Sequence, residues 1–234
     1  MAKRRAVRAK PANYNTPRML PAALILGSYL LGSIPFSYIV VRLVSGDDIR
    51  QHGSRNVGAT NVARTFGKGP GIIALLLDIA KGYTAIELAR WILSRSDWPF
   101  VASATGSPLT SREFWIALAG LIAVLAHMFP VWLRFHGGKG VATATGIFLA
   151  LDPRVVAAGA IVFLIVIVAS RIVSLASIVS AASVPLFFRF LTDAPFWRTI
   201  VSIIIAMAVI AKHHSNIARM AQGKERRMGE RKEE

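Results

Sequence analysis

The residues with the clearest chemical potential lie between His52 and Arg64, where the chain reads His-Gly-Ser-Arg-Asn-Val-Gly-Ala-Thr-Asn-Val-Ala-Arg between two long apolar runs. The glycines allow backbone conformations that turn successive N–H groups inward, while the hydroxyl, amide and guanidinium side chains add donors and positive charge. Such a set binds anions, and phosphate is the anion that we expect. The donors are Gly53, Ser54, Arg55, Asn56, Gly58, Thr60, Asn61 and Arg64.

A plainer interpretation of this stretch is also open. Loops between helices are often rich in Gly, Asn and Ser because they turn, and basic residues near a membrane often only set topology. The stretch is longer than a minimal turn, however, and repeatedly alternates small residues with donors suited to phosphate. This alternation favours an anion-binding loop.

A second donor-rich stretch runs from Phe135 to Thr143, as Phe-His-Gly-Gly-Lys-Gly-Val-Ala-Thr, and opens a short apolar segment. Free N–H groups and the positive end of a helix favour an anion at such a start. Gly137 and Gly138 would permit close approach, and Lys139 would supply a charge. A flexible turn with a lysine reaching for water explains the motif equally well. A Walker loop is excluded, because no Gly-x-x-x-x-Gly-Lys-Ser/Thr occurs.

A third polar group, His213, His214 and Asn216, follows the last apolar run. We expect no metal site, because the chain has no Cys and no His-x-x-x-His and its carboxylates are not grouped with the histidines. There is no Gly-x-Ser-x-Gly elbow and no histidine with an aspartate five positions later. A site rich in phosphate donors and poor in bases suits binding or transport of phosphorylated molecules, or acyl transfer from a mixed phosphoric anhydride.

The elements that position these residues are membrane helices. The 234 residues are 54% apolar, in blocks too long for the helices of a soluble core, and leave no room for a second soluble domain. A net charge of +16 would indicate nucleic acid in a soluble protein. In a multi-span protein this charge lies beside anionic lipids, and no aromatic-interleaved basic domain appears, so we expect no nucleic acid.

The hydrophobic pattern predicts an all-α, multi-span integral membrane protein with seven transmembrane helices, one of them short. Residues 1–18 are expected to form a basic disordered tail, 19–213 the transmembrane catalytic domain, and 214–234 a charged cytoplasmic tail. Pro35 should kink the first span, and Asp78 and Lys81 should form an ion pair in the second. Met19 precedes the first span, so translation could start there. The predicted spans are 20–43, 69–92, 112–133, 142–151, 154–170, 172–190 and 196–211, with a polar loop at 94–111.

An odd number of spans places the three donor-rich stretches on one face of the membrane and the N-terminal tail on the other. The donor-rich face carries 15 Lys and Arg against 12 on the opposite face, or 15 against 6 without the N-terminal tail. The positive-inside rule therefore favours a cytoplasmic position for the donors.

Five segments of the chain resemble the motifs of the PlsY family, the bacterial acyl-phosphate-dependent glycerol-3-phosphate acyltransferases. The similarity spans roughly residues 20 to 220. It implies seven transmembrane helices, an active site facing the cytoplasm, no cofactor, and transfer of a fatty acyl chain from acyl phosphate to the 1-hydroxyl of glycerol 3-phosphate. The products would be lysophosphatidic acid and phosphate. The motifs are Gly32-Ser-Ile-Pro-Phe, Gly53 to Arg64, Leu77-Asp-Ile-Ala-Lys-Gly82, Phe135 to Thr143 and His213-His-Ser-Asn216.

The resemblance also implies roles for individual residues. Ser54, Thr60, Asn61 and Arg64 would form much of a phosphate-binding loop, to which Gly53, Asn56 and Gly58 contribute. Lys139, with Gly137 and Gly138, would bind a substrate phosphate. His213 and Asn216 would hold glycerol 3-phosphate, and Ser177 would join them. The phosphate of the acyl donor would accept the hydroxyl proton, so that Ser54, Arg64, Lys139, His213 and Asn216 serve catalysis without a separate base.

Two features depart from the family pattern. Arg55 stands where a small residue, usually Gly, is expected, and the basic N-terminal tail is not part of the pattern.

A transporter of a phosphorylated metabolite is the alternative function, although a transporter would have polar groups at mid-membrane and repeated halves. The sequence leaves the acyl-chain preference and the oligomeric state open.

Overall fold

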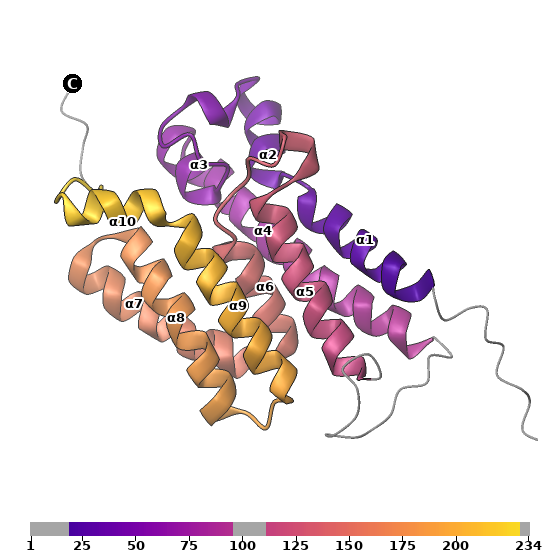
Figure 1. The fold of residues 1–234 in the computed structure, drawn as a ribbon. Helices are drawn as coiled ribbons and strands as arrows, with labels where there is room; N and C mark the ends of the chain where they lie inside the picture. Colours follow the sequence, from indigo (N-terminus) through magenta and orange to yellow (C-terminus); the bar gives the residue numbers. More distant parts are fainter. Residues whose placement is uncertain (1–18, 96–110, 230–234) are drawn as a thin grey trace, which may run out of the picture.

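The structure, a computed structural model, describes residues 19–95 and 111–229. Within these ranges the chain is a bundle of helices without strands (Figure 1). Two 3₁₀ turns, Ile49–Gln51 and Val131–Leu133, lie in the connections. The helices are α1 (Met19–Ser33), α2 (Phe36–Ser45), α3 (Ala59–Thr65), α4 (Lys68–Ser94), α5 (Arg112–Met128), α6 (Val141–Leu151), α7 (Pro153–Ser170), α8 (Val173–Leu191), α9 (Phe196–Lys212) and α10 (His214–Ala221).

The prediction of an all-α, multi-span membrane protein is confirmed. Among the described residues, four segments are long and apolar enough to cross a bilayer, and α9 with α10, bent by 56°, makes a fifth if the pair is one span. The helix at 141–151 is short, as predicted. The count of seven stays a prediction, because α4, with its internal charges, is not among these segments. The four segments are Leu20–Ser45, Arg112–Leu133, Pro153–Ser170 and Val173–Leu191.

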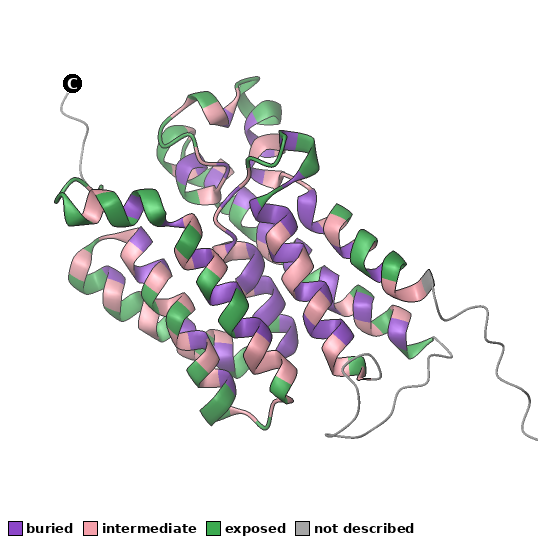
Figure 2. Ribbon diagram, in the orientation of Figure 1, coloured by how far each residue is buried: buried purple, intermediate pink, exposed green. Residues whose placement is uncertain are grey.

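Figure 2 shows exposed residues, in green, along the helices of the bundle. Many of these exposed residues are large and apolar, as on a lipid-facing surface. On α7, Ile165 is 63% exposed and Val168 is 79% exposed. Only 17% of the 18 residues of this helix are buried inside the protein. The bilayer therefore supplies most of the apolar surroundings of α7.

The first span is broken at Pro35, as predicted. α1 ends at Ser33 and α2 begins at Phe36, because proline has no N–H to continue the ladder. The N–H of Phe36 bonds instead to the carbonyl of Ile34 at 3.1 Å. The predicted ion pair in α4 is also present, with Lys81 Nζ 2.8 Å from Asp78 Oδ1.

Helices α4 and α6 pack closely because glycines lie where they cross. A Cβ on Gly82 would overlap the carbonyl oxygen of Thr143, and a Cβ on Gly146 would overlap the carbonyl oxygen of Ile79. Small residues at crossings are the usual means by which membrane helices bring their backbones together. This crossing fixes the start of α6 beside α4.

Two short helices were not expected from the sequence. The stretch at 45–68, predicted as a loop, contains α3, whose Val62 is fully buried and whose Ala63 lies against Gly71 of α4. The predicted tail at 214–234 begins with α10, which buries Asn216. Both helices are too short for a periodic signal, and packing rather than propensity forms them. The N-terminal tail and most of the 94–111 loop lie outside the described residues.

Candidate active site

A cavity of about 790 Å³ lies where α3, α6, α8 and α10 meet. Figure 1 shows α3 and α10 at the same end of the bundle, as the predicted convergence requires. One part of the cavity is lined by donors, and another by apolar side chains of α6, α7 and α8. The predicted residues that line it are Gly53, Ser54, Asn56, Gly58, Thr60, Asn61, Arg64, Lys139, Ser177, His213 and Asn216. Its apolar residues include Phe148, Val155, Val156, Phe163, Leu164 and Val184.

The loop before α3 is shaped by Asn61. The Asn61 side chain is buried, accepts the Ser54 N–H at 2.9 Å, and donates to the carbonyls of His52 and Asn56, both at 3.1 Å. Both amide protons are thus used within the loop. Gly53 has φ +59°, and a Cβ there would meet the Asn61 side chain. Asn61 therefore holds the loop in shape, while the Ser54 hydroxyl remains at the cavity.

Arg55 has a left-handed backbone, φ +60°, which a non-glycine residue rarely adopts. Its side chain borders the main cavity and also a second cavity of about 670 Å³. The second cavity is strongly basic, and its cationic lining residues are Arg50, Arg55, Arg134, Lys139, Lys212 and Arg219.

Lys139 connects the start of α6 to the C-terminal residues. Its ammonium donates to the Asn216 side-chain oxygen, and the Asn216 amide donates in turn to Glu225. Glu225 also accepts from the Ser174 hydroxyl at 2.8 Å and from Arg219 Nε at 2.7 Å. Three separate segments of the chain therefore meet at one carboxylate beside Lys139.

The charges at this end of the cavity perturb one another. Burial, reinforced by Arg219, Arg64 and Lys212, lowers the pKa of Lys139 to about 8, although Glu225 opposes this shift. Burial also lowers the pKa of Arg64. For Glu225 burial acts upward, but the hydrogen bonds from its three partners together lower the pKa of its carboxyl. The site thus has excess positive charge held partly away from water, which favours an anionic guest.

Gly137 and Gly138 do not line the main cavity. Their N–H groups donate to the carbonyls of Met128 and His127, both at 3.2 Å, at the C-terminal end of α5. A Cβ on Gly137 would overlap the His127 carbonyl, and one on Gly138 would overlap the His127 ring. The two glycines therefore dock the loop on α5, and the cavity lining from this motif begins at Lys139 and continues through Ala142.

His213 is buried and its Nδ1 lies 2.7 Å from the carbonyl oxygen of Val209. Because a carbonyl can only accept, Nδ1 carries the proton, and Nε2 of the neutral ring is free to accept a hydrogen bond. The Ser177 hydroxyl donates to the carbonyl of Val173 at 2.9 Å and keeps its lone pairs. Both side chains can hold a hydroxyl-bearing substrate.

The comparisons with known proteins agree with this geometry. The family described as glycerol-3-phosphate acyltransferase matches residues 22–223. The chain is 44% identical over 215 residues to the glycerol-3-phosphate acyltransferase of Thermosynechococcus vestitus, with 92% of this chain and 98% of that protein covered. The enzyme of the same description from Acaryochloris marina is 41% identical, with coverages of 89% and 92%. The chain belongs to the glycerol-3-phosphate acyltransferase family.

Solved structures support the same assignment. The crystal structure of PlsY (YgiH), an integral membrane glycerol 3-phosphate acyltransferase, in its glycerol 3-phosphate form, matches with a TM-score of 0.76 and 37% identity and covers 89% of this chain and 96% of that one. The lysophosphatidic acid form matches with a TM-score of 0.74 and 35% identity, with coverages of 89% and 95%. The protein is thus a multi-pass membrane acyltransferase.

The candidate active site of the acyltransferase also contains three residues that the sequence did not predict, namely Ser174, Arg219 and Glu225. Glu225 lies within a run of charges after the last apolar helix, and nothing in its spacing marks it. One signal in the sequence could have indicated Ser174. Two serines, Ser174 and Ser177, stand at the start of α8, and a helix start favours an anion. In the acyltransferase this start of α8 faces the Glu225 carboxylate.

Proposed function

We propose that the protein transfers a fatty acyl group from acyl phosphate to the sn-1 hydroxyl of glycerol 3-phosphate at the cytoplasmic face of the cell inner membrane. The products are lysophosphatidic acid and inorganic phosphate, and no metal or other cofactor takes part. The observation that carries this proposal is the division of the large cavity into a cationic part and an apolar part. An amphiphile with an anionic head fits such a cavity, and acyl phosphate is one.

In this reaction the hydroxyl oxygen attacks the acyl carbonyl carbon, and the bond from that carbon to the bridging phosphate oxygen breaks. The hydroxyl proton passes to the departing phosphate, so no protein base is required. Arg64 and Lys139 stabilise charge on the phosphates, as preorganised donors do. His213 accepts from a hydroxyl of glycerol 3-phosphate through Nε2, and Asn216, Ser54 and Ser177 orient the substrates.

Several further groups have supporting roles in this proposal. The N–H groups at the start of α6 lie next to Lys139 and add the positive end of a helix to the phosphate site. Thr60 at the cavity wall adds a hydroxyl donor. Gly137 and Gly138 contribute by docking the loop rather than by contact with phosphate, because their N–H groups are engaged with α5.

The test is lysophosphatidic acid formation by purified, metal-stripped protein given glycerol 3-phosphate and either palmitoyl phosphate or palmitoyl-CoA. We expect product with palmitoyl phosphate alone. Arg64→Ala and Lys139→Ala should each lower kcat/KM by roughly 10- to 100-fold, since a charge-assisted hydrogen bond contributes about 1.5–3 kcal/mol. Lys68→Ala, which removes an exposed lysine away from both cavities, is the matched control.

Each outcome separates two interpretations. Product with palmitoyl-CoA alone would show that the acyl donor is a thioester rather than acyl phosphate, while the protein would remain an acyltransferase. No product with either donor, from folded protein, would contradict the proposed reaction and direct attention to transport of a phosphate ester. Full activity of Lys139→Ala would remove Lys139 from the site.

A further inference from the structure

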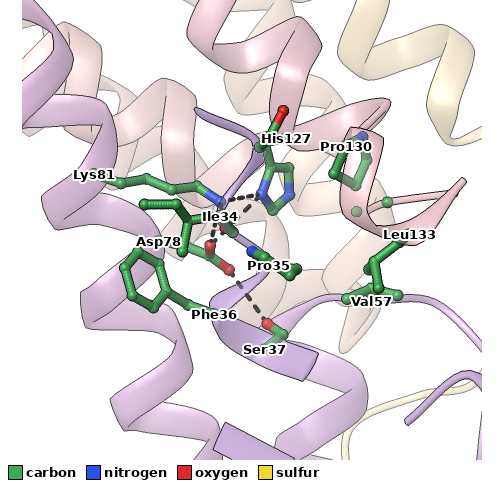
Figure 3. A pocket seen from close by; sticks show the side chains of 13 residues that line it. Ile34, Pro35, Phe36, Ser37, Val57, Asp78, Lys81, His127, Pro130 and Leu133 are labelled. Carbon is green, nitrogen blue, oxygen red and sulfur yellow. Dashed lines mark hydrogen bonds and ion pairs between the residues drawn. The ribbon is translucent and has the colours of Figure 1, made fainter. Parts of the chain in front are cut away.

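Three ionisable side chains are buried together next to the break in the first span, at the back of the loop that carries Lys139 (Figure 3). Asp78 and Lys81 come from α4, and His127 comes from α5. Their side chains are 2%, 1% and 7% exposed, respectively. Lys81 Nζ lies 2.8 Å from Asp78 Oδ1 and 2.9 Å from His127 Nδ1, and donates to the carbonyl of Ile34 at 2.8 Å. The ammonium thus lies within 2.9 Å of three possible acceptors.

The contact with Ile34 follows from the break at Pro35. The Ile34 carbonyl accepts the Phe36 N–H and, as a second donor, the Lys81 ammonium, because the break leaves it outside the regular helix ladder. Lys81 thereby ties α4 to the junction of α1 and α2. Stability alone does not account for the charges, since replacing a buried ion pair by apolar residues is often neutral or stabilising.

The ammonium also fixes the state of His127. An ammonium can only donate, so Nδ1 of His127 accepts, and the neutral ring carries its proton on Nε2. Both Asp78 oxygens are engaged as well, Oδ1 by Lys81 and Oδ2 by the Ser37 hydroxyl at 3.2 Å. Asp78 and His127 border the main cavity, where Lys81 and Ser37 are their polar partners.

His127 is the link between this cluster and the loop. Its main-chain carbonyl accepts the Gly138 N–H at 3.2 Å, and its ring occupies the place where a Cβ of Gly138 would lie. Lys139 follows Gly138 directly, and its ammonium reaches Asn216. A continuous series of contacts therefore runs from the break at Pro35, through Lys81 and His127, to the ammonium of Lys139.

We propose that Asp78, Lys81 and His127 are positioning residues for Lys139, acting through the contact between the His127 ring and Gly138. The cluster holds the loop so that the Lys139 ammonium stays beside Asn216, partly withdrawn from water. This inference rests on the proposed function in one respect, namely that Lys139 binds a substrate phosphate. The position and solvation of Lys139 can be measured without turnover.

The first test is the double variant Asp78→Asn/Lys81→Met, which removes both charges together and leaves no uncompensated one. The matched control is Glu87→Gln/Arg90→Met, which removes an ion pair of the same i,i+3 spacing on the same helix, 2.6 Å long and half exposed, away from the loop. We expect kcat/KM to fall roughly tenfold to 100-fold in the first variant and to stay unchanged in the control, since small displacements of a positioning group have effects of this size.

The second readout is the rate of reductive methylation of Lys139 against pH, followed by peptide mass spectrometry. Methylation requires the neutral amine, so its midpoint reports the pKa, which is about 8 in this protein. Lys139 faces Arg64, Lys212, Arg219 and Glu225, none of which is changed in these variants. If the loop loosens and Lys139 gains water, the midpoint should rise by about one pH unit. A merely structural cluster would leave it unchanged.

His127→Asn covers the case in which the double variant fails to fold. Asparagine keeps an acceptor near the place of Nδ1 for Lys81 but removes the ring edge that contacts Gly138. A raised Lys139 midpoint in either folded variant supports the proposal, even if the wild-type protein proves inactive with both acyl donors. An unchanged midpoint in both folded variants would overturn it, whether or not kcat/KM falls.

Discussion

The Lys139 ammonium donates a hydrogen bond to the side-chain oxygen of Asn216, a residue 77 positions later in the sequence. This bond joins the loop before α6 to the short helix that follows the last apolar segment. Its two partners lie at the same cavity as Arg64 and Ser54, from the stretch before α4. The proposed active site is therefore assembled from three parts of the chain that meet only in the folded protein.

Activity should decline at alkaline pH because Lys139 loses its charge there. Burial disfavours the ammonium and lowers its pKa to about 8, so the proton is bound below this pH and lost as pH rises through it. Since the charged form is the one proposed to bind substrate phosphate, we expect kcat/KM to fall above about pH 8. In Lys139→Arg the side chain stays charged, so whatever activity this variant has should decline only at a higher pH than in the wild-type protein. The same alkaline decline in both proteins would assign it to another group.

Glu225→Gln should move this alkaline limb to lower pH. The Glu225 carboxylate raises the pKa of Lys139 against the effect of burial and of the nearby cations. Glutamine keeps an acceptor for Ser174 and Asn216 but removes the negative charge, so the Lys139 pKa should drop further below its ordinary value. The pH profile of kcat/KM measures the shift, and Glu87→Gln is the control. An unshifted limb would show that Glu225 does not influence Lys139 in solution.

Arg55→Gly should separate stability from substrate affinity. A left-handed backbone at arginine lowers the free energy of unfolding by about 1–2 kcal/mol, and glycine removes this strain. Glycine also makes the unfolded chain more flexible, which lowers the free energy of unfolding by about 0.5–1 kcal/mol. We expect the thermal midpoint in detergent to hold or rise slightly, while KM for a phosphate substrate rises roughly threefold to tenfold through loss of the cation.

Arg171→Gly is the control for this change. Arg171 has φ +61° and borders neither of the two cavities that Arg55 borders, so its replacement should have the same small effect on stability and none on KM. An unchanged KM in Arg55→Gly would mean that the arginine contributes nothing to phosphate binding.

Gly146→Ala should loosen the crossing of α4 and α6. The added methyl group would overlap the carbonyl oxygen of Ile79, and because backbone atoms cannot rotate aside, the helices must separate. Overpacking of this kind costs about 1–3 kcal/mol, so the thermal midpoint and activity should both fall. Gly27→Ala, where a Cβ would meet open space, should leave both unchanged. Equal midpoints for the two variants would show that the crossing tolerates separation.

The apolar elements could be predicted from the sequence because long hydrophobic runs determine where helices form in a membrane. The predicted 154–170 and 196–211 segments differ from α7 and α9 by one residue at a boundary. The break at Pro35 and the pairing of Asp78 with Lys81 followed from the chemistry of proline and of buried charge. Eleven of the thirteen predicted site residues line one cavity, since motif and topology together brought them to one face.

The remaining features depend on contacts that no local pattern records. α3 and α10 form because Val62 and Asn216 are buried by distant segments. Glu225 gains its place from hydrogen bonds to Ser174 and Asn216, which belong to different helices. Gly137 was predicted to contact phosphate because glycine amides often bind anions, but its N–H donates to the carbonyl of Met128 at the end of α5.

Asn216 and Glu225 follow α9 in the sequence, and this order has a consequence for biosynthesis. Once the ribosome has made α1 to α9, these helices can already lie in the membrane, yet Asn216 and Glu225, which complete the cavity, have still to be translated. The N–H of Met228 bonds to the carbonyl of Arg171 at 2.7 Å, so this segment closes onto the connection between α7 and α8. A chain interrupted by a stop codon between α9 and Asn216 would therefore keep these apolar helices, but we expect it to have no acyltransferase activity.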